Sequence, residues 1–192
     1  MLCPMPPDPE YLAAAVEAAR RGETSGFETL YRVFNPPLVR FLRQQLPWVA
    51  EDLAADTWLD AARGLASFDG DGDDFRRWLF TIARRRVVDH FRREGRRVTT
   101  TPLTGHDDPG RGDDAAGEAL AGLAAQEAIA ALVRDLPESQ AEVVVLRVVA
   151  DLSVEDVARV TGRSAGAVRV LQHRALRRLA TLWDPTESQG AG

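Results

Sequence analysis

The chain contains no lysine, so all 24 of its Lys-plus-Arg side chains are arginines. It has one cysteine, Cys3, and neither an internal disulfide nor a cysteine-based metal cluster can therefore form. No apolar run approaches the roughly 20 residues that a membrane-spanning helix needs. The first residues, MLCPMPPDPE, lack the basic and apolar stretches of a secretory signal. These absences argue against a disulfide scaffold and against membrane insertion, and they predict a cytoplasmic protein.

Enzyme signatures are also lacking. His90, His106 and His173 are scattered without the spacing of metal ligands, and no glycine-rich phosphate loop or nucleophile motif is present. We therefore predict a protein that is not an enzyme and that needs no cofactor or metal.

Positive charge gathers in two segments of a chain whose formal net charge is -5. Phe75–Arg97 holds nine arginines and two acids, and Arg163–Arg178 holds five arginines and no acid. The rest of the chain has ten arginines and 27 acids. Two basic segments in an acidic background are suited to bind a polyanion locally. The pattern indicates nucleic acid as the partner.

Hydrophobic residues recur at helical spacing along most of the chain, which predicts an all-α fold. Thr99–Gly117 combines prolines, glycines, threonines and acids and is predicted to be a flexible, acidic linker. Residues 1–10 and the polar tail 184–192 are expected to be disordered. The predicted helices are Tyr11–Arg21, Phe27–Leu46, Glu51–Phe68, Phe75–Arg93, Glu118–Leu136, Glu138–Ala150, Ser153–Val160 and Ser164–Leu182.

Prolines and acids set several of these boundaries. Pro36 and Pro37 lie inside the second helix, where we expect a kink or a division into two helices. The acidic sequence Asp69–Asp74 is predicted to be a loop. The valine-rich run Val143–Val149 could alone be a buried strand, but the preceding Pro137 and the helical neighbours favour a helix. The third helix is expected to bury Leu53, Trp58, Leu59, Ala62 and Leu65.

The fourth helix separates into an apolar side and a basic side on a helical wheel. We expect Trp78 to belong to the core rather than to stack on a base. The basic side can then contact a nucleic-acid backbone while the other side is buried. The apolar side holds Phe75, Trp78, Leu79 and Ile82, extended by Phe80, Val87 and Phe91. The basic arc, roughly 100° wide by helix geometry, holds Arg77, Arg84, Arg85 and Arg92.

Residues 153–182 have the pattern of a helix-turn-helix DNA reader. Ser153 and Ser164 can each cap a helix, and Gly162 can take the left-handed conformation of a short turn. An ordinary helical hairpin would look similar, but the lack of acids in Arg163–Arg178 favours DNA. The residues expected to face inward are Val154, Val157, Val160, Val168, Leu171, Leu176 and Leu179. Available for phosphates or base edges are Arg169, Gln172, His173 and Arg174.

Three blocks of this sequence resemble bacterial RNA polymerase sigma factors of the extracytoplasmic-function (ECF) type. The family's second conserved region is similar to FRRWLFTIARRRVVDHFRR, and its polymerase-gripping helix is similar to EDLAADTWLDAARGLASF. Its fourth region is similar to LPESQAEVVVLRVVADLSVEDVARVTGRSAGAVRVLQHRALRRL. Together the similar blocks cover Phe27–Leu46, Glu51–Arg97 and Leu136–Leu179. The resemblance implies a subunit that binds core RNA polymerase through its beta-prime clamp and beta flap, directs it to promoters and helps to open the −10 element.

The resemblance also implies roles for individual residues. Polymerase contacts would come from Asp52, Leu53, Asp56 and Trp58. Contacts with the −10 element would come from Asp69, Asp71, Asp73, Asp74, Arg77, Arg84, Arg85 and Arg92, with the acidic loop capturing a flipped base. Contacts with the −35 element would come from Arg163, Ser164, Arg169, Val170, Gln172, His173 and Arg174. An anti-sigma factor is a further implied partner.

The implied domains are two small helical units joined by the acidic linker. They would divide the chain into residues 1–26 (tail and short helix), 27–98 (sigma region 2), 99–127 (linker), 128–183 (sigma region 4, a helix-turn-helix) and 184–192 (tail).

Two other interpretations remain open from the residues alone. A one-component transcription regulator would place a helical sensor domain before the helix-turn-helix and would bind DNA without polymerase. A sensor core has no need of nine arginines in Phe75–Arg97, which argues against it. A purely structural helical adaptor leaves the second basic segment unexplained.

Overall fold

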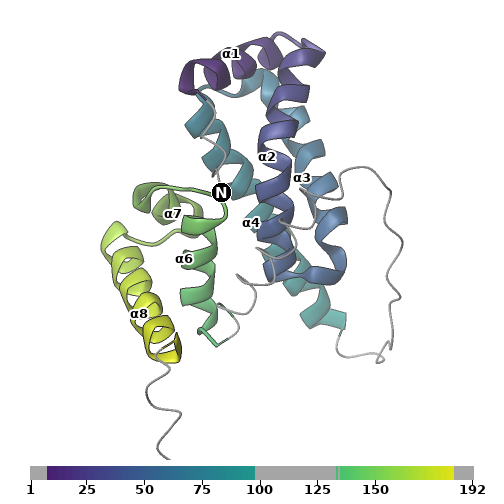
Figure 1. Ribbon diagram of the computed structural model, residues 1–192. Coiled ribbons are helices and arrows are strands. Elements are labelled where there is room, and N and C mark those ends of the chain that lie inside the picture. The colour runs from purple at the N-terminus through teal and green to yellow at the C-terminus, as the bar shows by residue number, and fades with distance from the viewer. Residues whose placement is uncertain (1–7, 98–132, 134, 184–192) are drawn as a thin grey trace, which may run out of the picture. The chain divides into compact units, whose positions relative to one another are not determined.

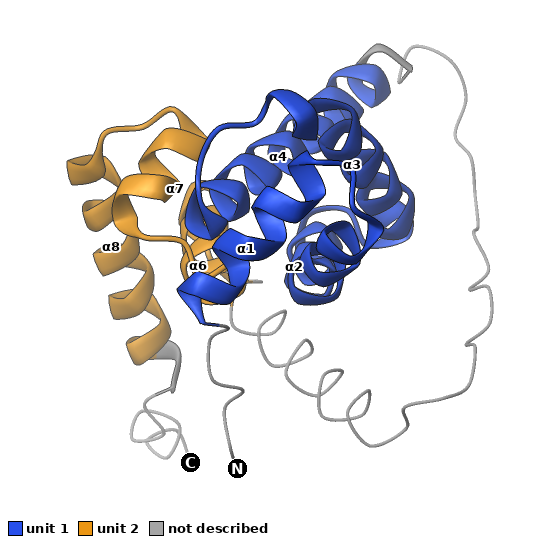
Figure 2. Ribbon diagram, turned by 90° about the horizontal axis from the view of Figure 1, so that it is seen from above, with its two compact units in different colours: residues 1–107 blue, residues 108–192 orange. Residues whose placement is uncertain are grey.

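The computed structural model describes residues 8–97, 133 and 135–183, and the regular structure among them is helical throughout (Figure 1). The prediction of an all-α fold is therefore confirmed for the described residues. The chain divides into two compact units, unit 1 from Met1 to Asp107 and unit 2 from Asp108 to Gly192 (Figure 2). Unit 1 contains α1 (Pro9–Arg20), α2 (Thr24–Gln45), η1 (Pro47–Val49), α3 (Ala50–Gly64), η2 (Leu65–Ser67) and α4 (Gly72–Arg97). Unit 2 contains α6 (Glu138–Val148), α7 (Val154–Thr161) and α8 (Ala165–Trp183).

Helix α1 begins earlier than the sequence predicted. The carboxylate of Asp8 accepts a hydrogen bond from the backbone N–H of Glu10 at 3.0 Å, and Pro9 occupies the first turn, where a missing N–H is harmless. Residues 8–10 are thus a capped helix start, which corrects the expectation of disorder for that part of residues 1–10. The chain turns after α1 at Gly22, whose φ of 83° suits glycine.

Helix α2 continues through Pro36 and Pro37, so of the two expected outcomes, a kink or a division into two helices, the division is wrong. A proline inside a helix removes a backbone hydrogen bond and costs about 3 kcal/mol. Packing offsets this cost, because Phe34 and Leu38 on either side of the pair are 1% and 0% exposed. Arg40 adds a contact by donating its Nε–H to the carbonyl of Pro36 at 3.3 Å. Burial of the helix therefore outweighs the local preference of the two prolines.

The acidic sequence Asp69–Asp74 is a loop only in its first part, since α4 begins at Gly72. The carboxylate of Asp71 accepts hydrogen bonds from the backbone N–H groups of Asp73 and Asp74, both at 2.9 Å. This contact satisfies the donors that a helix leaves unpaired at its N-terminus, and it explains the early start. Helix α4 is longer than the predicted helix at both ends.

Helix α3 is shorter than predicted, because the chain tightens into η2 after Gly64. Its apolar side is also narrower than the sequence suggested. Leu53, Trp58 and Leu65 are buried, as expected, but Leu59 is 53% exposed and Ala62 is exposed as well. The expectation that Leu59 and Ala62 belong to the core is therefore wrong.

An aromatic cluster fixes α4 against α2, α3 and the segment that precedes α4. Phe75 is fully buried, and its ring centre lies 5.6 Å from that of Phe34 and 5.8 Å from those of Phe68 and Trp78. Aromatic pairs at such distances contribute about 0.5–1.5 kcal/mol each beyond the burial of their area. The cluster gives the outer side of α4 a rigid base.

Helices α7 and α8 form the predicted helix-turn-helix, and its capping is confirmed. The hydroxyl of Ser153 accepts a hydrogen bond from the backbone N–H of Asp156 at 3.0 Å. The hydroxyl of Ser164 accepts one from the backbone N–H of Ala167 at 3.1 Å. Gly162 ends α7 in the left-handed conformation, with a φ of 70°.

The core of unit 2 agrees with the sequence in part. The valine-rich run is helical and mostly lies in α6, where Val143–Leu146 are four consecutive buried residues. On α8, Val168 is buried as predicted, but Leu176 is 54% exposed and Ala175 is buried instead. The neighbouring position therefore faces the core, and the prediction for Leu176 is wrong. The other predicted inward residues are buried (Val157, Val160) or half-buried (Val154, Leu171, Leu179).

Several predictions fall wholly or largely outside the described residues. They are the linker over 99–127, the disorder of residues 1–7 and 184–192, and the helix Glu118–Leu136 apart from residues 133, 135 and 136. Within the described ranges, no helix is both long enough and apolar enough to cross a membrane.

Candidate nucleic-acid interface

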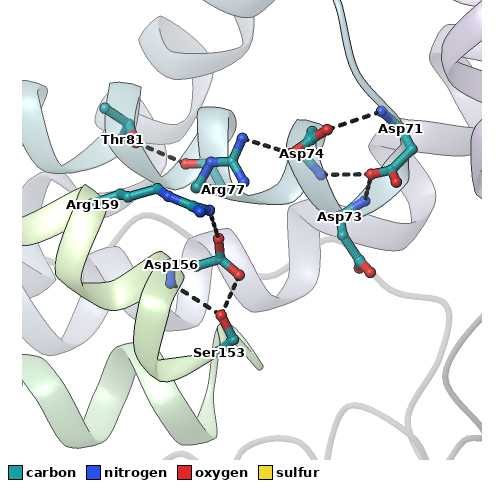
Figure 3. A network of polar contacts seen from close by, with 8 residues as sticks. All are labelled: Asp71, Asp73, Asp74, Arg77, Thr81, Ser153, Asp156 and Arg159. Carbon is teal, nitrogen blue, oxygen red and sulfur yellow. Dashed lines mark hydrogen bonds and ion pairs between the residues drawn. The ribbon is translucent and has the colours of Figure 1, made fainter. Parts of the chain in front are cut away.

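The acidic loop and the first turns of α4 form a hydrogen-bonded network (Figure 3). One carboxylate oxygen of Asp74 lies 2.6 Å from the guanidinium of Arg77, and the other accepts the backbone N–H of Asp71 at 3.4 Å. The carbonyl of Arg77 accepts the hydroxyl of Thr81 at 2.8 Å. Asp71 and Asp74 are thus engaged in building the loop, and Arg77 is held in one orientation by it.

Asp69 and Asp73 are the two predicted loop acids that extend into solvent. The side chain of Asp69 is 98% exposed and lies 4.0 Å from Arg20. The side chain of Asp73 is 74% exposed and lies 3.8 Å from Arg76, whose guanidinium also sits 5.6 Å from the ring centre of Phe34. Arg76 therefore belongs to the body of unit 1, while the two acids remain accessible to a ligand.

The predicted basic arc lies on the outer side of α4. Arg77 and Arg84 are partly exposed, Arg85 is exposed, and the side chain of Arg92 is 71% exposed at 3.7 Å from Asp89. The opposite side of the helix is in the core, since Leu79, Phe80, Ala83 and Val87 are all buried. The predicted division of α4 is therefore confirmed in part. On the predicted apolar side, four residues are buried (Phe75, Leu79, Phe80, Val87), two are half-buried (Trp78, Ile82) and Phe91 is exposed.

Arg86 is separate from this arc and binds α3 instead. It lies roughly 160° from Arg84 around the helix. Its guanidinium is 3.2 Å from the carboxylate of Asp56 and 2.5 Å from that of Asp60, and the pairs are partly buried. Arg86 therefore neutralises two acids of α3 and ties α3 to α4.

A cavity of about 450 Å³ opens beside this ion pair. Trp78 and Ile82 give it an apolar wall, and Arg85 gives it hydrogen-bond donors. Asp60 and Asp89, which also line it, are acceptors. An aromatic wall with both donors and acceptors has the chemistry to receive a nucleobase.

Of the four α3 residues expected to contact polymerase, the two acids are at the surface and the two apolar residues are buried. Asp52 is exposed and Asp56 is partly exposed. Leu53 and Trp58 are 8% and 5% exposed, and the indole N–H of Trp58 donates to the side-chain oxygen of Asn35 at 3.0 Å. Leu53 and Trp58 therefore hold α3 in place, and this burial corrects the expectation that their side chains form a contact surface.

On α8 the residues predicted to read DNA are at the surface. Val170 is 49% exposed, His173 and Arg174 are exposed, and Gln172 is partly exposed. Ser164 is exposed, but its hydroxyl is used in capping α8. The helix therefore presents a row of polar and apolar side chains of the kind that enters a major groove.

Two arginines of the second basic segment are ion-paired within unit 2. Arg163 lies 2.7 Å from Glu142 of α6, with side-chain exposures of 29% and 15%. Arg169 lies 2.6 Å from Glu155 of α7, with exposures of 61% and 54%. Arg163 thus ties the turn to α6, whereas the more exposed Arg169 stays within reach of a ligand.

Sequence reasoning missed the roles of Arg86 and Asp60 and the exposure of Phe91, which is 47%. A signal for Arg86 was present, because the helical wheel sets it roughly 100° or more away from the predicted basic arc and the preceding helix is acidic. Phe91 gave no such signal, since its position on the wheel alone cannot show where the core ends. Among the described residues, no group of three or more His, Cys, Asp or Glu side chains is arranged to hold a metal ion.

Comparisons with known proteins agree with this geometry. Residues 30–97 match the model of Sigma-70 region 2, and residues 126–179 match that of Sigma-70, region 4. The ECF RNA polymerase sigma factor BldN of Streptomyces coelicolor is 38% identical over 172 residues, which cover 87% of this chain and 64% of BldN. The chain therefore matches less than two thirds of the length of that relative.

Two further proteins are similar over nearly their whole length. The ECF RNA polymerase sigma factor ShbA of Streptomyces griseus is 33% identical over 180 residues, which cover 89% of this chain and 94% of ShbA. The sigma factor RpoE of Bartonella quintana, solved in complex with the anti-sigma factor NepR, has a TM-score of 0.62 at 25% identity and covers 81% of this chain and 95% of its own. Both basic segments, Phe75–Arg97 and Arg163–Arg178, lie inside matched regions. The chain belongs to the ECF family of RNA polymerase sigma factors, which direct the polymerase to promoters.

Proposed function

We propose that this sigma factor contacts promoter DNA at two separate elements, with α4 of unit 1 at the −10 element and α8 of unit 2 at the −35 element. The observation that carries the proposal is that each helix has a buried apolar side and an exposed side rich in arginine. Phosphates of DNA attract such a side, and base edges add the selectivity. In domain terms, residues 27–98 and 128–183 are the two DNA-binding parts and 99–127 joins them.

At the −10 element, the basic arc of α4 holds the phosphates of the opening duplex. Arg77, Arg84, Arg85 and Arg92 supply the positive charge. Asp69 and Asp73 extend into solvent beside the helix start, and their acceptors suit the amino groups of a flipped base. Asp71 and Asp74 contribute by fixing the loop that carries these two acids. Flipping costs a few kcal/mol, which base contacts must offset.

At the −35 element, α8 enters the major groove. Arg169 and Arg174 donate to base edges or phosphates, Gln172 and His173 add polar contacts, and Val170 packs on an apolar edge such as a thymine methyl group. Arg163 and Ser164 contribute mainly indirectly. Arg163 fixes the turn between α7 and α8, and Ser164 caps the first turn of α8. The base preference of the element follows from these side chains together.

Contact with core RNA polymerase is proposed for the exposed acids of α3, Asp52 and Asp56. The buried side chains of Leu53 and Trp58 hold α3 in place and so position these two acids. The beta-prime clamp would meet this surface, and the beta flap would meet unit 2. RpoE of B. quintana was solved with an anti-sigma factor, and we infer that this chain has such a partner too.

The chain is proposed to act in the cytoplasm, as a transcription initiation factor and not as an enzyme. Its acidic background, with a formal net charge of -5, repels free DNA and favours binding only in the presence of polymerase.

Gel-shift and run-off transcription assays with and without core enzyme test the proposal. We expect specific promoter binding and transcript synthesis only when core enzyme is present. Tight, sequence-specific binding by the free protein would favour a one-component regulator instead. Mapping transcript starts after overexpression would supply the promoter sequence for these assays.

A further inference from the structure

Helix α1 lies against the acidic loop that precedes α4. Leu12, near the start of α1, is 2% exposed and packs on Gly72, the first residue of α4. Arg20, in the last turn of α1, lies 4.0 Å from the carboxylate of Asp69 at the start of the loop. The segment from Asp69 to Gly72 therefore runs alongside α1, with one contact at each of its ends.

The contact at Gly72 leaves no room for a side chain. Gly72 is buried, and a β-carbon at this position would lie 2.4 Å from the β-carbon of Leu12, far inside van der Waals contact. The β-carbon of Leu12 is bonded to the backbone of α1, so it cannot turn away. Gly72 is not among the glycines with a positive φ, and its backbone conformation would suit alanine. The close approach of α1, and not the turn itself, therefore requires glycine here.

The contact at Asp69 acts on the other end of the loop through charge. Glu17 lies 3.3 Å from the guanidinium of Arg20 and holds it on the side of α1 that faces the loop. The side chain of Asp69 is 98% exposed, so the pair contributes little to the free energy of unfolding. Its effect is on the direction in which the Asp69 carboxylate points.

We propose that Leu12 and Arg20 are positioning residues, through which α1 sets the place of the loop acids at the −10 element. The inference rests on the proposed role of Asp69 and Asp73 as acceptors for a flipped base. It adds a helix that lies before the matched region 30–97. Hydrogen bonds to a base edge depend on distance and angle, so a shift of the loop weakens binding of the preferred base most. The position of α1 therefore controls base selectivity as well as folding.

The test uses the full chain in complex with core RNA polymerase and four promoter probes. Each probe has an unpaired non-template strand over the −10 element, and the four differ only in the base at the position where substitution weakens binding most. The measured quantity is the ratio of the dissociation constants for the least and the most favoured base. We expect a ratio of roughly 5 to 150 for the unchanged protein, the discrimination that one good pair of hydrogen bonds gives.

Gly72→Ala and Arg20→Ala should each lower this ratio. Arg20→Ala changes a side chain outside the core and should lower it by roughly 1.5- to 5-fold, the range of an exposed ion pair. Arg20→Ala should have no further effect on the ratio when Asp69 is already alanine. Gly72→Ala should lower the ratio more than Arg20→Ala does, because Leu12 and the first turn of α4 must move apart.

Two other glycines separate positioning from stability. Gly64→Ala places a β-carbon 2.8 Å from the ring of Trp78, which strains the contact between α3 and α4. It should lower the free energy of unfolding, as Gly72→Ala does, but retain the base ratio. Gly95→Ala adds a methyl group to α4 with nothing within 4 Å, and it should change neither quantity.

An unchanged base ratio in Gly72→Ala or in Arg20→Ala would overturn the role of Leu12 or of Arg20, respectively. Equal weakening of all four probes by Arg20→Ala would also overturn its role, since Arg20 would then contact a phosphate. If Gly72→Ala does not fold, Arg20→Ala and its combination with Asp69→Ala decide the question. The proposed function fails in a different way, namely when Asp69→Ala and Asp73→Ala leave the ratio unchanged or when the unchanged holoenzyme shows no base preference.

Discussion

The arginines of α4 and of α8 differ in how firmly the protein holds them. On α4, Arg76, Arg77 and Arg86 have side-chain exposures of 14%, 27% and 24%, and each pairs with an acid of unit 1. On α8, Arg169 is 61% exposed, and Arg174 is exposed with no ion-pair partner among the described residues. Three arginines of α4 are thus mostly buried and paired within unit 1, whereas the arginines of α8 are exposed.

This difference suits two kinds of DNA contact. On the basic arc of α4, Arg77 is held by Asp74 before binding, so it can contact a phosphate without losing much side-chain freedom, whereas Arg76 and Arg86 serve the fold of unit 1. Exposed arginines adjust to base edges, and they lose side-chain freedom when they do so. The comparison leads us to expect stability effects from arginine substitutions in unit 1 and specificity effects from those in unit 2.

Arg174→Ala should have the largest effect and should act on binding alone. An arginine that donates two hydrogen bonds to a guanine contributes about 1–3 kcal/mol of discrimination. We expect the holoenzyme to bind a promoter with an intact −35 element more weakly by this amount, and a promoter with a scrambled element as before. Arg177→Ala, exposed on the same helix, is the control. An equal loss on both promoters would show that Arg174 contacts only phosphates.

Arg86→Ala should lower the free energy of unfolding by about 1–2 kcal/mol. The substitution removes hydrogen bonds to two carboxylates and leaves Asp56 and Asp60 to repel each other, and the partial exposure of the pairs limits the loss. Urea unfolding followed by circular dichroism measures it. Arg85→Ala, an exposed neighbour, should change the free energy of unfolding by less than about 0.5 kcal/mol. If the two variants lowered the free energy of unfolding equally, the contrast between ion-paired and exposed arginines would be wrong.

Asp71→Ala should lower the free energy of unfolding by about 1 kcal/mol, because the first turn of α4 loses its cap. Asp71→Asn should retain most of the stability, since asparagine caps as well as aspartate does. The control Asp69→Ala changes an acid of the same loop whose side chain is 98% exposed, and it should leave unfolding unchanged. If Asp69→Ala were the more destabilising variant, the assignment of the capping residue would be wrong.

Glu155→Gln should have the smallest effect on stability, below about 0.5 kcal/mol, because both partners of the pair with Arg169 are more than half exposed. Its effect on binding should be visible in a double-mutant cycle with Arg169→Ala on promoter DNA. We expect the effects of the two substitutions on the free energy of DNA binding to be non-additive, because Glu155 orients the side chain of Arg169 before DNA binds. Additive effects would mean that the pair plays no part in recognition.

Much of the fold follows from local signals in the sequence. Ser153, Gly162 and Ser164 act as predicted because capping and a left-handed turn depend on neighbouring residues only. The burial of Phe75 and Leu79 follows from helical spacing in the same way. These features need no knowledge of distant parts of the chain.

The predictions that failed depend on tertiary contacts. Pro36 and Pro37 remain helical because Phe34 and Leu38 are buried by other helices. Phe91 is exposed because α4 extends past the core. Neither outcome is visible from local spacing.

In the candidate site, too, local spacing predicted some features, and others depend on tertiary contacts. Helical spacing alone predicted the arc of Arg77, Arg84, Arg85 and Arg92. The pairing of Arg86 with Asp60 joins residues 26 positions apart and requires the packing of α3 on α4. The engagement of Asp71 in capping likewise appears only once the first residue of α4 is known.

Footprinting of the holoenzyme at saturating concentration, combined with permanganate detection of unpaired thymines, tests the two-element account most directly. The account predicts that Arg174→Ala loses protection of the −35 element and keeps that of the −10 element. It predicts that Arg84→Ala keeps the −35 protection and loses permanganate reactivity in the −10 element. Loss of both signals together in each variant, or of neither, would contradict the assignment of the two elements to two separate helices.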